Sequence, residues 1–177
     1  LFTPLSKYYI SEMANRIADN ALQIHGGSGY TEDYVVSKIY RDARITNIYE
    51  GTTQLQIVAC IGGVVSGMSP TGFLRAYLDK ETSKFAATDR LLRVRKLFES
   101  VATAFSEIKD SATRDSLAFE VVESTARCIN GILLERSASR LKDTQKTDRL
   151  ALAAEYHIDS LAILESNLIK LQERGKA

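Results

Sequence analysis

Apolar residues spaced three and four positions apart recur along most of this chain, and strand-like alternation of apolar and polar residues is absent. Such spacing places the apolar residues along one face of a helix. Prolines interrupt helices, and the chain has only two, Pro4 and Pro70, each where a helix is expected to begin. The sequence therefore predicts an all-α fold, an up-and-down helical bundle with additional helices.

The first expected helix has Thr3 as its N-cap and ends near His25, because the glycines of residues 26–29 accommodate positive φ. Its apolar face is expected to comprise Leu5, Tyr9, Met13, Ile17, Ala21 and Ile24. A short helix over residues 35–43, an irregular stretch over 45–51 and a helix over about 52–66 are expected to follow.

Gly67 and Ser69–Pro70 interrupt the helical pattern, so residues 1–69 and 70–177 are expected to form two parts. The second part is expected to hold a helix over about 71–86 and three long helices. Their predicted packing seams are Leu91, Val94, Phe98, Val101, Phe105 and Ile108; then Leu117, Val121, Cys128 and Ile132; then Leu150, Ala154, His157, Leu161, Leu164, Leu168 and Leu171. His157 is expected to be a hydrogen-bonded core residue.

Charge and composition exclude several classes of function. The 23 Lys and Arg residues nearly balance 22 Asp and Glu residues, which argues against nucleic-acid binding by bulk electrostatics. No apolar run has the length of a membrane span. Cys60 and Cys128 lie in no metal-ligand or redox spacing, so both are expected to be reduced and buried, and no metal site is expected.

Residues 23–56 carry the chemically unusual features of the chain. A glycine cluster ends one helix, and the lone carboxylate of Glu50 precedes Gly51 where another helix begins. Helix N-termini favour anionic or polar ligands. The glycines match neither the dinucleotide fingerprint nor the P-loop. From these residues alone, a ligand site and a purely structural turn with a helix cap remain equal alternatives.

Residues 1 to about 66 resemble the C-terminal segment of acyl-CoA dehydrogenases. Tyr49–Glu50–Gly51–Thr52 matches the Tyr-Glu-Gly-Thr motif of that family, and Val35 departs from a position where many members carry proline. The spaced positions that match the family's signature are Gln23, Gly26, Gly27, Gly29, Tyr30, Asp33, Lys38 and Asp42.

The resemblance implies oxidation of an acyl-CoA thioester to the trans-2-enoyl-CoA, with FAD accepting the β-hydrogen as hydride. Glu50 is then the base that removes the α-proton. Gly51 is expected to leave room for the acyl chain or the flavin, and Tyr49 to line the acyl pocket or to pack beneath it. Thr52 and Gln54 match positions that contact the FAD of their own subunit. The positions that match contacts to a neighbouring subunit's FAD are Gln23, Gly26 and Gly27.

The same resemblance implies a homodimer or homotetramer and electron-transfer flavoprotein or a similar acceptor as partner. The family's preceding helical and β-domains are expected to lie upstream of Leu1, so the 177-residue chain alone is expected to be inactive. Residues 70–177 resemble a helical C-terminal extension. A cytoplasmic location is expected. Two alternatives are an acyl-CoA oxidase on the same scaffold and a non-catalytic helical interaction module.

Overall fold

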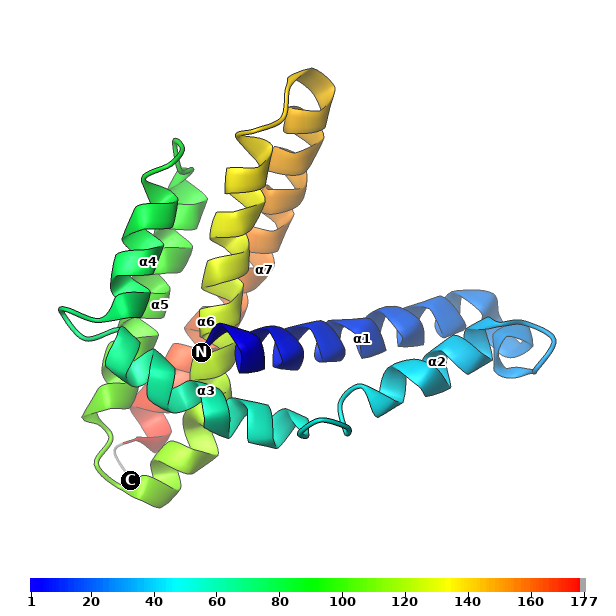
Figure 1. The fold of residues 1–177 in the computed structure, drawn as a ribbon, viewed down its shortest axis with the longest axis horizontal. Coiled ribbons are helices and arrows are strands. Elements are labelled where there is room, and N and C mark those ends of the chain that lie inside the picture. The colour runs from blue at the N-terminus through cyan, green and yellow to red at the C-terminus, as the bar shows by residue number, and fades with distance from the viewer. Residues whose placement is uncertain (176–177) are drawn as a thin grey trace. The chain divides into compact units, whose positions relative to one another are not determined.

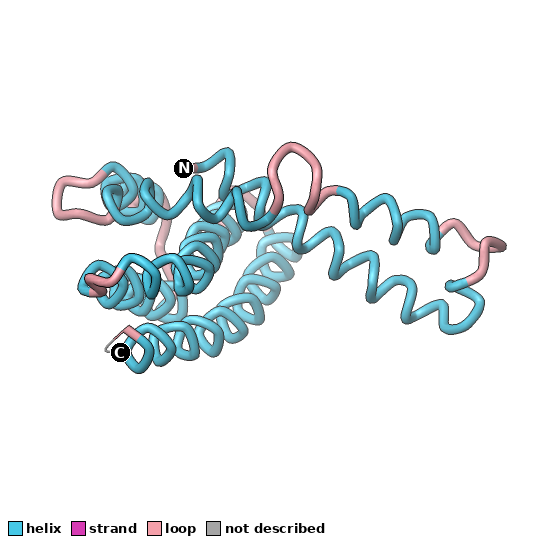
Figure 2. The backbone as a smooth tube through the Cα atoms, turned by 90° about the horizontal axis from the view of Figure 1, so that it is seen from below, coloured by secondary structure: helices cyan, strands magenta, loops and turns pink. Residues whose placement is uncertain are grey.

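A computed structural model describes residues 1–175, and all regular secondary structure within them is helical (Figures 1 and 2), which confirms the all-α prediction. The helices are α1 (Phe2–Tyr30), α2 (Val36–Ile45), α3 (Thr53–Gly67), α4 (Phe73–Thr82), α5 (Asp89–Glu107), α6 (Ser111–Ala138) and α7 (Asp143–Arg174). The chain forms two compact units, Leu1–Cys60 and a second that begins at Ile61, so the division falls within α3. Within residues 1–175, no helix combines the length and the apolar content that crossing a bilayer requires.

The first unit is built on the antiparallel pair α1 and α2 (Figure 1). Gly26 interrupts the helical geometry of α1 with φ 60° and ψ −149°, so the glycine cluster ends the first helical stretch where predicted, and one further turn leads to Tyr30. The N-cap prediction is wrong. α1 begins at Phe2 because the Leu5 amide already donates to the Leu1 carbonyl, and Leu1 provides no side-chain cap.

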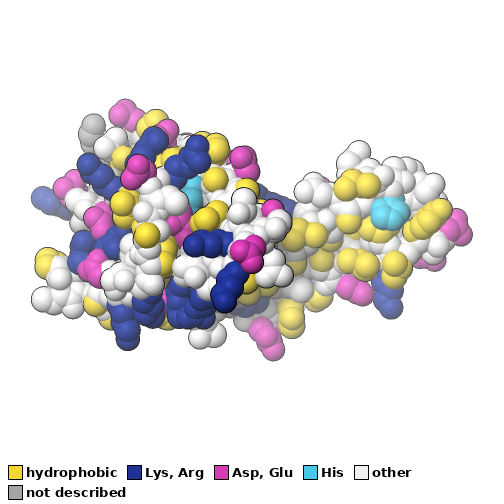
Figure 3. Space-filling view, turned by 90° about the horizontal axis from the view of Figure 1, so that it is seen from above, with side chains coloured by type: hydrophobic (Ala, Val, Ile, Leu, Met, Phe, Trp, Pro, Cys, Tyr) yellow, Lys and Arg dark blue, Asp and Glu magenta, His cyan; other side chains and the backbone are white. Residues whose placement is uncertain are grey.

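The predicted apolar face of α1 is only partly buried. Ile17 and Ile24 are 69% and 85% exposed, and the buried face instead includes Ser11 and Ala18. α2 meets α1 on this small and polar face, where Asn15 reaches the Ala43 carbonyl, and the isoleucines therefore remain outside. Apolar side chains accordingly gather on the surface of the α1–α2 part, at the right of Figure 3.

The second unit is a helical bundle in which α5, α6 and α7 pack on one another and α4 packs on α6. The predicted seam of α5 is buried throughout. The seam of α7 was predicted in part. His157, Leu164 and Leu171 are buried, but small and polar residues such as Ser160 and Asn167 complete the buried face, and the remaining predicted leucines lie at its edge.

A buried polar cluster joins three elements of this bundle. His157 Nε2 lies 2.9 Å from Glu135 Oε1, the Thr88 amide donates to Glu135 Oε2 at 2.9 Å, and the Thr88 hydroxyl bonds the same carboxylate. The expectation of a satisfied core histidine is therefore confirmed for Nε2 only, because the buried Nδ1 has no hydrogen-bond partner among the described residues. Gly131 gives the imidazole its space, because a Cβ there would lie 2.8 Å from His157 Cε1. Cys60 and Cys128 are buried free thiols, as predicted.

Substituting Gly131 with alanine tests this close approach. The added methyl group must displace a ring that is hydrogen-bonded and enclosed, so Gly131→Ala should destabilise the chain by about 1–3 kcal/mol despite the better helix propensity of alanine. Gly62 is the matched control, since a Cβ on this helical glycine meets no atom within 4 Å. Gly62→Ala should leave stability unchanged or raise it by about 0.5–1 kcal/mol. Urea unfolding of both variants measures the difference; equal effects would contradict the packing.

The Glu135 carboxylate should make stability depend on acid pH. Burial disfavours its charged form, but hydrogen bonds from His157 and Thr88 outweigh burial and hold the pKa of Glu135 below its ordinary value. A carboxylate with a lowered folded-state pKa contributes stability above its unfolded pKa, and that contribution is lost as the pH falls through the folded value. The stability difference between wild type and Glu135→Gln should therefore shrink in the acid limb of a pH series of urea unfolding curves. A constant difference at all pH values would contradict this account.

Candidate active site

Glu50 lies in the turn formed by residues 46–52, between α2 and α3, and its side chain is exposed. Its backbone is left-handed, with φ 52°, and Gly51 follows at φ 95°. A residue with a side chain costs about 1–2 kcal/mol in this region, so surrounding contacts must hold it there. Two features exclude a side chain at Gly51. Its positive φ is strained for a residue with a side chain, and a Cβ would lie 2.5 Å from Gln56 Nε2.

Two side chains bind the carbonyl groups of the 46–52 turn. The Lys7 ammonium group, on α1, donates to the Thr46 carbonyl at 2.6 Å and to the Gly51 carbonyl at 2.9 Å. It also lies 5.6 Å from the centre of the Tyr49 ring, within the range of a cation–π interaction. Gln56 Nε2 donates to the carbonyl of Glu50 at 3.0 Å and to that of Gly51 at 3.3 Å. The left-handed segment is therefore bonded on both sides.

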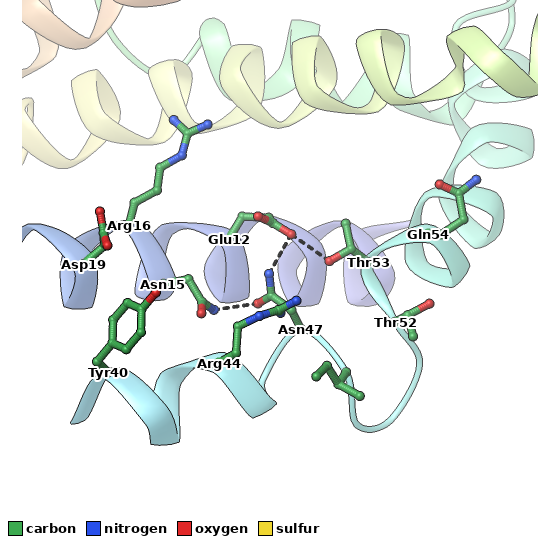
Figure 4. Close-up of a pocket in the computed structure, with 11 residues that line it drawn as sticks. Glu12, Asn15, Arg16, Asp19, Tyr40, Arg44, Asn47, Thr52, Thr53 and Gln54 are labelled. Carbon is green, nitrogen blue, oxygen red and sulfur yellow. Dashed lines mark hydrogen bonds between the residues drawn. The ribbon is translucent and has the colours of Figure 1, made fainter. Parts of the chain in front are cut away.

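A second group of polar side chains joins α1 to the turn and to the start of α3 (Figure 4). Asn15 Nδ2 donates to Asn47 Oδ1 at 2.7 Å, and Asn47 Nδ2 donates to Glu12 Oε1 at 2.7 Å. The same Glu12 oxygen accepts from the Thr53 hydroxyl at 2.7 Å. These hydrogen bonds fix where the turn begins and where α3 starts.

An open cavity of about 640 Å³ lies beside this group. Arg16 and Arg44 line it, and neither guanidinium forms an ion pair with any residue of the described part of the chain. Thr52 caps α3 by accepting from the Leu55 amide at 3.4 Å. The cavity suits a polar group, because its lining combines two arginines, the two acids Glu12 and Asp19, and the N-terminus of α3. Its lining residues are Glu12, Asn15, Arg16, Asp19, Tyr40, Arg44, Asn47, Ile48, Thr52, Thr53 and Gln54.

The structure does not bring all the predicted cofactor residues together. Thr52 and Gln54 line the cavity, whereas Gln23, Gly26 and Gly27 lie at the far end of α1. Gln23 stands eleven residues beyond Glu12, which corresponds to roughly 16 Å along the helix axis. Gln23, Gly26 and Gly27 are exposed, and a Cβ on either glycine would meet no atom within 4 Å.

The remaining predicted site residues lie outside the cavity. Tyr49 is 50% exposed and lies beside Lys7, while Glu50, Tyr49 and Gly51 do not line the cavity. His25, at the end of the first helical stretch, has Nδ1 2.8 Å from the Ala21 carbonyl oxygen, and its ring meets the Tyr34 ring edge-on. Within residues 1–175, no group of three His, Cys, Asp or Glu side chains is placed to hold a metal ion.

Sequence reasoning missed the side chains that hold the turn: Lys7, Glu12, Asn15, Asn47 and Gln56. One signal was present. Lys7, Ser11 and Asn15 recur at intervals of four, which places them on one face of α1 beside the apolar residues. This polar row marks the face of α1 that meets the turn and α2.

Comparison with known proteins shows what the first unit is similar to. Residues 2–61 match the family model described as acyl-CoA dehydrogenase, C-terminal domain. Over 64 residues the chain is 48% identical to the caffeyl-CoA reductase-Etf complex subunit CarC of Acetobacterium woodii, which covers 36% of this chain and 16% of that protein. It is 50% identical over 54 residues to an acryloyl-CoA reductase (NADH) of Anaerotignum propionicum, covering 30% of this chain and 14% of that protein.

A probable acyl-CoA dehydrogenase, YngJ of Bacillus subtilis, is 49% identical over 51 residues, covering 29% of this chain and 13% of that protein. The chain thus spans about a sixth or less of the length of these relatives.

The fold likeness extends further along the chain than the sequence likeness. A crystal structure of an acyl-CoA dehydrogenase from Bacillus anthracis complexed with FAD matches 95% of this chain and 32% of its own, with a TM-score of 0.74 at 17% identity. Beyond residue 61 the likeness to this structure is one of fold alone. Residues 2–61 of the 177-residue chain are therefore similar to an acyl-CoA dehydrogenase C-terminal domain in sequence, and the helices that follow resemble such a structure in fold.

Proposed function

We propose that this chain is the C-terminal part of a flavin-dependent acyl-CoA dehydrogenase that converts an acyl-CoA thioester to the trans-2-enoyl-CoA. The observation that carries the proposal is the 46–52 turn. It presents an exposed carboxylate, Glu50, on a left-handed backbone held by hydrogen bonds at both ends, within the segment that matches the family. Strained residues held by their surroundings cluster at functional sites.

Glu50 is proposed as the base. Its carboxylate takes the proton from the α-carbon of the thioester. The electrons of the broken C–H bond are shared with the thioester carbonyl and become the double bond between the α- and β-carbons as the β-hydrogen leaves with its electron pair. Closing the site over substrate expels water and raises the basicity of a carboxylate. Bound FAD supplies the acceptor for the β-hydrogen, which leaves as hydride.

The negative charge that develops on the thioester oxygen needs a donor already in place. Within residues 1–175, no acceptor takes a hydrogen bond from the backbone N–H of Glu50, so this donor is free for substrate. Gly51 adds no side chain of its own beside this donor, and Gln56 Nε2 occupies the space that a Cβ would take. The Tyr49 ring is proposed to face the acyl group. One short segment then carries both the base and the donor.

The residues fit a dinucleotide cofactor. Thr52 and Gln54 line a cavity that also presents the guanidinium groups of Arg16 and Arg44, which are proposed to meet the phosphates of the cofactor, while Glu12 and Asp19 line the same cavity. The open backbone at Gly26 and Gly27 admits a second ligand at the other end of α1. This separation supports contacts with two flavins, one of the same subunit and one of a neighbour. A homodimer or homotetramer would provide that neighbour, and its contacts would cover apolar surface such as Ile17 and Ile24.

The names of two relatives favour a second candidate, reduction of a 2-enoyl-CoA. In that direction Glu50 would begin protonated and deliver its proton to the α-carbon, so the same residue serves both reactions. Electron-transfer flavoprotein is the proposed electron partner, because one relative is named as a subunit of an Etf complex.

Glu50→Gln in the complete enzyme tests the base. A carboxamide keeps the size of the side chain but accepts no proton, so turnover should fall about 100-fold or more while FAD content is retained. Glu32→Gln is the matched control, since Glu32 is also an exposed acid of the first unit and pairs at 3.8 Å with Arg41, which is itself exposed. Steady-state oxidation of a series of acyl-CoA substrates measures both. Unchanged turnover in Glu50→Gln would remove this residue from the mechanism.

The 177-residue chain by itself should be inactive and should bind FAD weakly or not at all. The reason is that its open cavity offers the flavin only part of a binding pocket. Visible absorbance of the purified chain after incubation with FAD and gel filtration checks this expectation. A yellow protein with one FAD per chain would contradict it.

A further inference from the structure

We propose that Lys7 is a positioning residue for Glu50: its ammonium group holds the left-handed turn in the conformation that presents the base. The inference rests on the proposed function of Glu50. Lys7 does not touch the reacting atoms in this account. It acts through the backbone, by bonding the carbonyl groups of Thr46 and Gly51, which stand on either side of Glu50 in the chain.

The two bonds are placed where they control the turn. Thr46 directly follows α2, and Gly51 directly follows Glu50, so one cation connects both ends of the irregular segment to α1. The other side chain that binds these carbonyls, Gln56, belongs to α3, the helix that the turn leads into. Lys7 is therefore the residue that fixes the Glu50–Gly51 backbone relative to a different helix.

The groups that the Lys7 ammonium contacts also favour a role in positioning the turn. Within residues 1–175, Lys7 forms no ion pair; its partners are two neutral carbonyls and the face of the Tyr49 ring. A lysine ammonium is strongly hydrated, and this partly buried one gives up water for the turn. Its three donors match two carbonyl groups and one aromatic face.

Loss of these bonds has a specific consequence. The left-handed conformation of Glu50 is disfavoured for a residue with a side chain, so an unheld turn relaxes toward ordinary backbone angles. Relaxation at φ of residue 50 redirects its side chain, because Cβ is attached to the same Cα. Misplacing a catalytic group by about 1 Å can cost about 100-fold in rate.

The decisive variants are Lys7→Met and Lys7→Arg in the complete enzyme. Lys7→Met keeps the aliphatic length but removes the donors, so kcat should fall about tenfold or more with KM and FAD content nearly unchanged. The isotope effect of α-deuterated substrate on kcat should rise, since proton removal becomes slower than the other steps. Lys7→Arg retains donors and should restore most of the rate. Lys96→Met, at an exposed position of α5, is the control.

A purely structural role would lower the fraction of enzyme that holds FAD but leave kcat per bound FAD and the isotope effect unchanged. That result would overturn the inference. Activity of Lys7→Met equal to that of the Lys96→Met control would also overturn it. If Glu50→Gln retained turnover, the proposed function would fail, and this inference with it, whatever the behaviour of Lys7.

A measurement on the 177-residue chain tests the role of Lys7 without any activity assay, and so distinguishes failure of this inference from failure of the proposed function. Backbone amide hydrogen exchange at Ile48 and Tyr49, which donate within the turn to the Ile45 carbonyl, reports how well the turn is held. Exchange there should be several-fold faster in Lys7→Met than in wild type or Lys7→Arg, and unchanged in the α5–α7 bundle. Equal exchange in wild type and Lys7→Met would show that Lys7 does not hold the turn and would overturn the inference on its own.

Discussion

The hydrogen bonds that side chains give to the carbonyl groups of the 46–52 turn are the interactions on which the candidate site depends. A turn between two helices has no helical or sheet ladder to satisfy all of its carbonyl groups. Lys7 and Gln56 supply the missing donors. The packing of α2 on α1 therefore matters for the candidate site, because α1 carries Lys7, whose ammonium group bonds carbonyl groups near both ends of the turn.

The polar network around Glu12 adds a second constraint. Its carboxylate receives donors from the turn and from the first residue of α3, so the helix start and the turn cannot shift independently. The consequence is a rigid boundary between a cavity lined by Thr52 and Gln54 and the segment that presents Glu50. The proposed cofactor site and the proposed base then lie on either side of one turn, as the proposed chemistry requires, since both must meet a single substrate.

The sequence was sufficient for the fold class because helical periodicity is a local property that survives in every long segment. The seam of α5 was predicted correctly for this reason, from Leu91 to Ile108. The buried face of α1 was not predicted correctly. Periodicity locates an apolar stripe on a helix but does not say whether the element that covers it lies in the same unit. Ile17 and Ile24 belong to the predicted stripe and remain exposed.

The candidate site also contains residues that the sequence could indicate and residues that it could not. Glu50 and Gly51 could be picked out as candidates because a family motif has fixed residue types at fixed spacing. Lys7 could not, since its role depends on a hydrogen bond across 44 residues of chain to the Gly51 carbonyl. Main-chain acceptors leave no trace in a sequence, so a donor that binds them resembles any other surface lysine. The positive φ of Glu50 is equally invisible, because glutamate is not a residue that left-handed backbone favours.

We propose that the 46–52 turn presents a base to a thioester. A crystal structure of the complete enzyme with FAD and a non-reactive acyl-CoA thioester would show the distance between the two. We expect a Glu50 carboxylate oxygen within about 3.5 Å of the α-carbon, with the turn still bonded to Lys7. A Glu50 side chain directed away from the ligand, with another acid at the α-carbon, would contradict it.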